Sequence, residues 1–175
     1  GIGDGQREDQ RSEGGHVDLA RRHGIEAAIL SDSIEGEARD VAQVHAAMAR
    51  EIAARNRPFG KPVVLLSGGE TTVTLRGKGR GGRNGEFALA LAIALDNVNN
   101  VLALSGDSDG IDGSENNAGA HVDGTSARRM REAGIDPQAA LADNDAYTAF
   151  EAVGDLFVTG PTGTNVNDFR AILIR

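Results

Sequence analysis

The stretch PVVLLSGGETTVTLRGKGRGGRNGEFALALAIAL, residues 62–95, decides the fold class of this chain. It begins with a continuous apolar run, Pro62–Leu66, which is typical of a buried strand. It ends with FALALAIAL, which is apolar on all sides and predicts a helix deep in the core. Seven glycines lie between Gly68 and Gly85. A strand, a glycine-rich loop and a buried helix in this order are typical of a layered α/β domain.

Further regular elements are expected on both sides of this stretch. Apolar side chains recur at helical spacing from Gly36 to Asn56, which predicts a surface helix. Strands are expected at Glu26–Leu30, Thr71–Arg76, Val101–Ser105, Asp155–Thr159 and Phe169–Ile174; helices are expected from Asn84 to about Asp96, from Thr125 to before Gly134, and from Asn144 or Asp145 to before Gly154. This alternation predicts an α/β/α domain with a mostly parallel, partly mixed sheet.

The composition excludes several classes of protein. Eighteen Lys and Arg against 26 Asp and Glu give a net charge of −8, which argues against general binding to nucleic acid or an anionic membrane. The absence of cysteine excludes disulfides, cysteine-ligated zinc and a thiol nucleophile. No apolar run approaches the roughly 18 residues needed to span a bilayer, so we expect a soluble, cytoplasmic protein. Residues 1–15 contain one aliphatic side chain and predict a disordered or linker segment before a domain at 16–175.

Three glycine-rich loops start at the carboxyl ends of predicted strands. They lie at Ser67–Glu70, Ser105–Gly113 and Gly160–Asn167. Ligands bind at that edge in open α/β sheets, and exposed backbone N–H groups suit an anion such as phosphate. Each loop taken alone is explained equally well as a tight turn. Three together favour a ligand-binding cleft.

The segment RGKGRGGRNGE, residues 76–86, is the densest group of cations in this acidic chain. Four of them, Arg76, Lys78, Arg80 and Arg83, fall within eight residues. Arginine offers a planar, permanently charged fork to phosphate or carboxylate oxygens. A solvated basic loop is the simpler alternative. Gly77, Gly79 and Gly82 also match the dinucleotide-binding pattern GxGxxG, although cations are unusual inside that turn.

Two further segments offer polar ligands. Asp109 and Asp112 could hold Mg²⁺ or could cap turns, and both interpretations stay open. The segment GPTGTNVND, residues 160–168, offers uncharged hydrogen-bonding groups suited to a polyhydroxy substrate or a nucleotide: Thr162, Thr164, Asn165 and Asn167. The four histidines show no metal-ligand spacing.

The motifs together resemble a known family. LLSGGETTVTLRGKGRGGRNGEFALALAIAL (65–95), SGDSDGIDGSENNAGAHVDG (105–124) and LADNDAYTAFEAVGDLFVTGPTGTNVNDFRAILI (141–174) are similar to the C-terminal MOFRL domain of the glycerate 2-kinase family. Members of that family have also been labelled hydroxypyruvate reductases. The resemblance is strong from Val63 to Arg175 and looser from Gly24 to Arg55.

The resemblance implies an ATP- and Mg²⁺-dependent transfer of a phosphoryl group to the 2-hydroxyl of glycerate. It also implies an active site shared with a larger N-terminal domain that this chain lacks, so the chain alone is expected to be inactive. Arg83 is the first choice and Arg80 the second for contact with substrate or the transferred phosphate. The expected substrate- and nucleotide-binding residues are Ser67, Gly68, Gly69, Glu70, Thr71, Lys78, Asn84, Glu86, Gly110, Gly160, Thr162, Gly163, Thr164, Asn165 and Asn167.

Two other functions stay open at this point. The GxGxxG match and the alternative family label allow an NAD(P)H-dependent hydroxypyruvate reductase. The glycine-rich loops alone also allow a ligand-binding or assembly module without catalysis.

Overall fold

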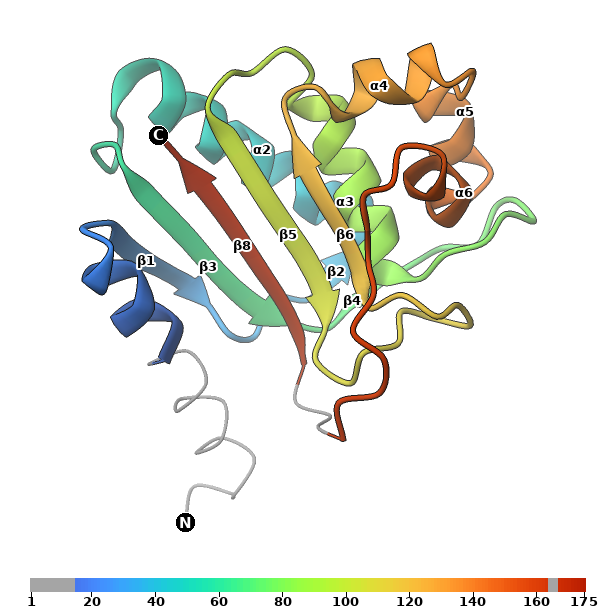
Figure 1. Ribbon diagram of the computed structural model, residues 1–175, viewed down its shortest axis with the longest axis horizontal. Helices are drawn as coiled ribbons and strands as arrows, with labels where there is room; N and C mark the ends of the chain where they lie inside the picture. The colour runs from blue at the N-terminus through green and yellow to red at the C-terminus, as the bar shows by residue number, and fades with distance from the viewer. Residues whose placement is uncertain (1–14, 164–166) are drawn as a thin grey trace.

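A six-stranded mixed sheet forms the centre of the fold in the computed structural model, which describes residues 15–163 and 167–175 (Figure 1). The strands, in spatial order, are β1 (Glu26–Ser31), β3 (Val63–Gly69), β8 (Asp168–Ile174), β5 (Val101–Asp107), β6 (Gly119–Asp123) and β7 (Leu156–Phe157). A second, two-stranded sheet pairs β2 (Gly36–Glu37) with β4 (Thr71–Thr72).

Two long helices cover one face of the main sheet, as Figure 1 shows. α2 (Ala38–Arg55) packs through a row of buried alanines, whose small side chains let the helix lie close to its neighbours. α3 (Arg83–Ala94) is buried on all sides from Asn84 to Ala92, as the sequence predicts. The short helices α4 (Ser126–Glu132), α5 (Pro137–Ala142) and α6 (Ala146–Glu151) complete this layer beside β6.

The last strand, β8, lies in the middle of the sheet between β3 and β5 (Figure 1). It runs antiparallel to both of them, and β6 is antiparallel to β5 and β7, so β1–β3 is the one parallel pair of the main sheet among the described residues. The predicted α/β class with a mixed sheet is confirmed, but the sheet is mostly antiparallel rather than mostly parallel. The helical connections make β1, β3 and β5 point the same way, and β8 then enters between two of them.

Other differences concern the ends of elements and the second helical layer. The strand expected at Thr71–Arg76 is only two residues long, because the Thr74 N–H donates to the Glu37 carboxylate instead of to a neighbouring strand. Strand β6 and helix α5 were not predicted. A helix over residues 15–22 lies on the face of the sheet opposite α2 and α3, where the His16 ring lies 4.5 Å from the Phe169 ring. The expectation of disorder at residues 1–15 falls almost wholly outside the described residues.

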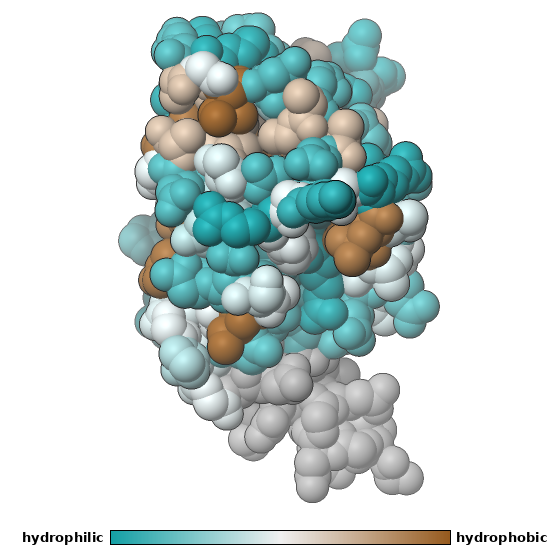
Figure 2. All heavy atoms as spheres, turned by 90° about the vertical axis from the view of Figure 1, so that its right-hand side faces the viewer, coloured by the Kyte–Doolittle hydropathy of each residue, from teal (hydrophilic) through white to brown (hydrophobic). Residues whose placement is uncertain are grey.

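No helix within residues 15–163 and 167–175 is long and apolar enough to cross a membrane. Figure 2 shows a mostly hydrophilic face on the side that carries the short helices, with only scattered hydrophobic spots.

Candidate active site

Three glycine-rich loops leave the main sheet at one edge. β3, β5 and β7 point in the same direction, so the loops that follow them start together, as the sequence predicts. β8 begins at this same edge because it runs the opposite way. The topology therefore brings Asp168 next to Thr71, although 97 residues separate them in the chain.

A pocket of about 400 Å³ opens at this edge. Its lining residues are Thr71, Thr72, Val73, Leu75, Gly81, Gly82, Arg83, Asp107, Asp112 and Gly113. Val73 and Leu75 supply an apolar wall, and Arg83 with the two aspartates supplies a charged one. The pocket thus combines an anion-binding group with acidic side chains on a surface open to solvent.

Arg83, the first residue of α3, is held by three carboxylates. Its Nε donates to Asp168 Oδ1 at 2.8 Å, its Nη2 to Asp107 Oδ2 at 3.0 Å and its Nη1 to Glu70 Oε1 at 2.8 Å. The Asp168 side chain is fully buried, whereas 66% of the Glu70 side chain is exposed. Burial opposes the charge on Arg83, but the hydrogen bond and charges of these carboxylates raise its pKa. The guanidinium is therefore permanently charged. Its Nε and Nη2 are fixed by Asp168 and Asp107, whereas its Nη1 bonds to the exposed Glu70, which another anion can replace.

Asp168 and Asp107 lie opposite each other on the neighbouring strands β8 and β5. Burial raises the pKa of Asp107, and the nearby charges of Asp109 and Asp168 add to this, while Arg83 and the Asp109 N–H oppose it. Two like charges in a cross-strand pair repel each other. Arg83 bonds to both, which explains why two acids can share one end of the sheet.

Asn84 and Asp112 build the first turn of α3. The Asn84 side chain donates to Asp168 Oδ1 at 2.7 Å and accepts from Ser105 Oγ at 2.7 Å. The two oxygens of Asp112 accept from the backbone N–H groups of Asn84, at 2.9 Å, and Gly85, at 2.7 Å. Asp112 therefore caps α3 from a distant loop. Burial raises the pKa of Asp112 to about 6, even though both N–H groups lower it.

The acidic loop and the third glycine-rich loop pack against each other. Asp109 closes its own turn, with Oδ1 accepting from the Ile111 N–H at 2.7 Å. A Cβ at Gly110 would lie 2.1 Å from the Gly160 carbonyl oxygen, and the Thr162 N–H donates to the Asp109 carbonyl oxygen at 3.0 Å. No three acidic or histidine side chains of the described residues gather in a metal-binding group. Magnesium binding by Asp109 and Asp112 stays a prediction.

Several predicted binding residues lie away from the pocket. The Ser67 hydroxyl is buried against His45, with Oγ 2.9 Å from Nε2, and a Cβ at Gly69 would lie 2.2 Å from the Ile34 carbonyl oxygen. A Cβ at Gly68 would lie 3.5 Å from the Asp32 Cα, which is an ordinary packing distance. Glu86 is buried and bonds to Arg39, with Nε at 2.8 Å, and to Asn144. Gly160, Gly163 and Asn167 belong to the third loop, and the predicted Thr164 and Asn165 lie outside the described residues.

The backbone of the basic segment is bound within the protein. Five successive N–H groups, from residue 76 to residue 80, donate to residues 143–145 at 2.7–3.1 Å. The acceptors include the side chains of Asp143, Asn144 and Asp145. A Cβ at Gly77 would lie 2.2 Å from Asp143 Oδ1, and one at Gly79 would lie 2.3 Å from the Asp145 Cβ. These glycines therefore serve close packing between two loops, and their N–H groups are not directed at a ligand.

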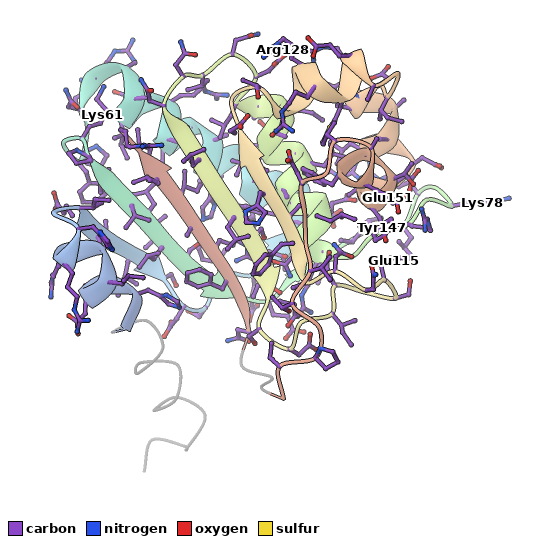
Figure 3. The ribbon with its side chains drawn as sticks, viewed as in Figure 1. Lys61, Lys78, Glu115, Arg128, Tyr147 and Glu151 are labelled. Atoms are coloured by element: carbon purple, nitrogen blue, oxygen red, sulfur yellow. The ribbon has the colours of Figure 1, made fainter. Side chains whose placement is uncertain are left out.

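The cations of this segment point in different directions. Lys78 extends from the tip of the loop into solvent (Figure 3). The Arg80 guanidinium lies 4.5 Å from the centre of the Tyr147 ring and within 3.6 Å of the carboxylates of Glu115 and Glu151. Of the two arginines predicted to be catalytic, only Arg83 lines the pocket.

Sequence reasoning missed Asp168 and Arg170 and did not select Asp107. Alternate residues of β8 are buried, and both Asp168 and Arg170 fall on this buried face. Two charged residues on the buried face of a strand are unusual, since buried charges are costly unless they are paired. The sequence DFRAILI, residues 168–174, shows these two charges at alternate positions. They can be recognised as buried only when the strand is known to lie in the middle of the sheet.

Comparisons with known proteins agree on one group. The model of the MOFRL family matches residues 63–168. The chain is 55% identical over 158 residues to an Agrobacterium vitis protein named "Putative hydroxypyruvate reductase", covering 89% of the chain and 41% of that protein. It is 44% identical to the D-glycerate 2-kinase of Thermotoga maritima, covering 89% of the chain and 37% of that enzyme. The crystal structure of a Thermotoga maritima glycerate kinase superposes with a TM-score of 0.89 and 43% identity, over 91% of the chain and 38% of that structure. The chain thus spans well under half the length of these relatives.

Proposed function

Because the chain belongs to the MOFRL family, we propose that it forms one domain of a glycerate 2-kinase, which transfers a phosphoryl group from ATP to the 2-hydroxyl of glycerate. The observation that carries this proposal is Arg83, fixed by buried carboxylates in the wall of an open pocket. The rest of the active site would come from a larger domain of the same enzyme, as the length of the relatives suggests. The proposed ligands are a small hydroxy acid and a nucleotide, in a cytoplasmic enzyme.

The charges of the pocket suit phosphoryl transfer. This reaction needs positioned groups that stabilise charge on the transferred phosphoryl, and little covalent chemistry from the protein. Arg83 supplies a planar cation whose Nε and Nη2 are held by Asp168 and Asp107. Its Nη1 bonds to the exposed Glu70, which a phosphate or carboxylate oxygen of a ligand can replace. Arg83 can therefore donate from Nη1 to the ligand while Nε and Nη2 stay bound to Asp168 and Asp107.

Magnesium fits this pocket as an ion shared with the nucleotide. Mg²⁺ commonly binds one or two carboxylates and completes its shell with water and phosphate oxygens. Asp109, on the turn beside the pocket, is the carboxylate that we propose for this role. Asp112 suits it less, because both of its oxygens accept from the first turn of α3. The bound ion would draw negative charge away from the phosphate oxygens.

A reductase is the second candidate, on the strength of the name of the Agrobacterium vitis relative. A nucleotide cofactor bound through GxGxxG would need backbone N–H groups at Gly77 and Gly79. Those groups donate to Asn144 and Asp143 instead, which favours the kinase.

The test compares the two reactions in the full-length protein. We expect ADP release, followed by a coupled assay, when D-glycerate, ATP and Mg²⁺ are supplied, and 31P NMR should show a new signal of a 2-phosphate. Residues 15–175 alone should release no ADP. Oxidation of NADH on addition of hydroxypyruvate, without ADP release, would replace the kinase by the reductase. Turnover of neither substrate would indicate a binding module.

A further inference from the structure

Arg170 is a fully buried arginine in the middle of β8. Its Nη2 donates to Asp168 Oδ2 at 2.7 Å and to Thr71 Oγ1 at 3.2 Å, and its guanidinium lies 5.0 Å from the centre of the Phe87 ring. Its Nε and Nη1 contact no acceptor among the described residues. Arg170 does not line the pocket.

Stability alone is a poor explanation for this side chain. Removing a guanidinium from water is costly, and two of its nitrogens gain nothing in return. Apolar residues that replace a buried ion pair often leave stability unchanged or increase it. Arg170 pairs in register with Ser67 of β3 and Ser105 of β5. An apolar side chain at this position could occupy the same space between the sheet and the helices. A functional reason for the charge is therefore more plausible than a structural one.

The contacts of Asp168 supply that reason. Arg170 binds Asp168 Oδ2, so the other oxygen, Oδ1, faces Arg83 Nε at 2.8 Å and Asn84 Nδ2 at 2.7 Å. We propose that Arg170 is a positioning residue, which fixes the orientation of Asp168 and through it the guanidinium of Arg83. The kinetic consequence rests on the proposed kinase function, whereas the structural consequence does not.

The surrounding charges make this support necessary. Asp168 faces Arg83 from α3, Asp107 from β5, Asp112 from the acidic loop and Arg170 on its own strand. Without Arg170, Arg83 would be the one guanidinium among the described residues bound to the cross-strand pair Asp107 and Asp168, and Asp168 could rotate. His45, on α2, does not replace the lost charge, because burial lowers its pKa.

The test uses three variants and one matched control. Arg170→Met removes the charge, Arg170→Lys keeps it in a shorter group, and Asp168→Asn removes the link between the two arginines. Ile172→Ala is the control, because Ile172 is the next buried residue on the same face of β8. The first readout is hydrogen exchange of the Arg83 Nε–H by 15N NMR in the chain itself, with the signal assigned by its loss in Arg83→Lys.

We expect exchange of the Arg83 Nε–H to become about 10-fold faster or more in Arg170→Met and Asp168→Asn, because its hydrogen bond opens more often. Arg170→Lys should recover part of the protection, and Ile172→Ala should leave exchange unchanged. In the full-length enzyme, Arg170→Met should lower kcat by about 10- to 100-fold with a smaller change in KM for glycerate. Ile172→Ala should keep its kcat.

Unchanged exchange in folded Arg170→Met would overturn the proposal, and so would faster exchange with an unchanged kcat. Equal effects of Ile172→Ala on exchange would do the same, because they would show general loosening. If Arg170→Met does not fold, Asp168→Asn and Arg170→Lys decide by the same readouts. If the wild-type enzyme does not phosphorylate glycerate, the proposed function fails, and exchange in the chain alone decides the role of Arg170.

Discussion

Arg80 and Arg83 are separated by only two residues, yet they lie in opposite surroundings. Arg80 lies on the surface, stacked on Tyr147 and close to two partly exposed glutamates. Arg83 is bound at 2.8 Å to an aspartate whose side chain is fully buried. The two residues are indistinguishable by charge and by local sequence, since each follows a glycine.

The difference lies in what holds each backbone. Residues 76–80 are bound to the loop at 143–145, which turns Arg80 toward α6. Gly82 then lets the chain pass close to Asp112, where a Cβ would lie 2.4 Å from Oδ1, and α3 starts under the edge of the sheet. A cluster of cations in a sequence is therefore not yet a binding site. We expect the functional residues to be those that a buried element carries to the pocket.

The largest expected effect tests this contrast directly. In the proposed full-length kinase, Arg83→Ala should lower kcat/KM for glycerate by about 10³-fold, because the proposal has Arg83 stabilise the transferred phosphoryl group. Arg80→Ala should lower it by less than about 10-fold, because its contacts are exposed. Coupled measurement of ADP release checks both, with circular dichroism to show that each variant is folded. Equal losses in the two variants would abolish the distinction.

The next effect concerns the cap that places Arg83. The pKa of Asp112 is raised from 3.8 to about 6, so the native state binds its proton more tightly than the unfolded state. The contribution to the free energy of unfolding is therefore present below pH 3.8 and is lost as the pH rises to about 6. It amounts to about 3 kcal/mol.

Urea denaturation at several pH values measures this contribution. The free energy of unfolding of the wild type, relative to that of Asp112→Asn, should fall by about 3 kcal/mol between pH 3 and pH 7. A constant difference across this range would show that Asp112 is not held in a buried, ionisable state at the start of α3.

A third, smaller effect tests the glycines on the Arg80 side. Gly79→Ala would bring a Cβ within 2.6 Å of the Asp145 backbone, and we expect a loss of about 2 kcal/mol in the free energy of unfolding. Gly60→Ala is the control, because a Cβ there meets no atom within 4 Å. If Gly79→Ala instead raised the KM for ATP and left stability unchanged, the result would indicate that this loop binds the nucleotide.

The smallest effect is expected at the ion pair of Arg80. Glu151→Gln removes a carboxylate 3.4 Å from Arg80 Nη2, and both side chains are about half exposed. We expect the free energy of unfolding to change by less than about 0.5 kcal/mol. Chemical denaturation in low and high salt measures it. A change in the free energy of unfolding above 1 kcal/mol would show that the ion pair of Arg80 stabilises the fold, contrary to the contrast with Arg83.

Much of this arrangement could be predicted from the sequence. The run PVVLL and the buried helix at Asn84 predicted β3 and α3, and the glycines predicted three loops at one edge. Arg83 was selected by its neighbourhood and by resemblance, and the structure places it in the pocket wall. Its binding and catalytic role stays a prediction.

The remainder depends on contacts between distant parts of the chain. No local pattern shows that Asp143 and Asp145 bind the basic segment, so Arg80 and Lys78 were predicted as site residues together with Arg83. The antiparallel insertion of β8 was hidden for the same reason, because strands that follow helices suggest parallel pairing. Asp168 was missed because it comes close to Arg83 only when β8 is inserted between β3 and β5.

The central place of β8 also bears on how the protein is made. Among the described strands β8 is the last in chain order, so β3 and β5 leave the ribosome before the strand that separates them exists. Until β8 arrives, both present unpaired edges that could join each other or another nascent chain. Because β8 also carries Asp168 and Arg170, its insertion completes the six-stranded sheet and the surroundings of Arg83 together. Partly folded chains would therefore lack an organised pocket and remain prone to aggregation.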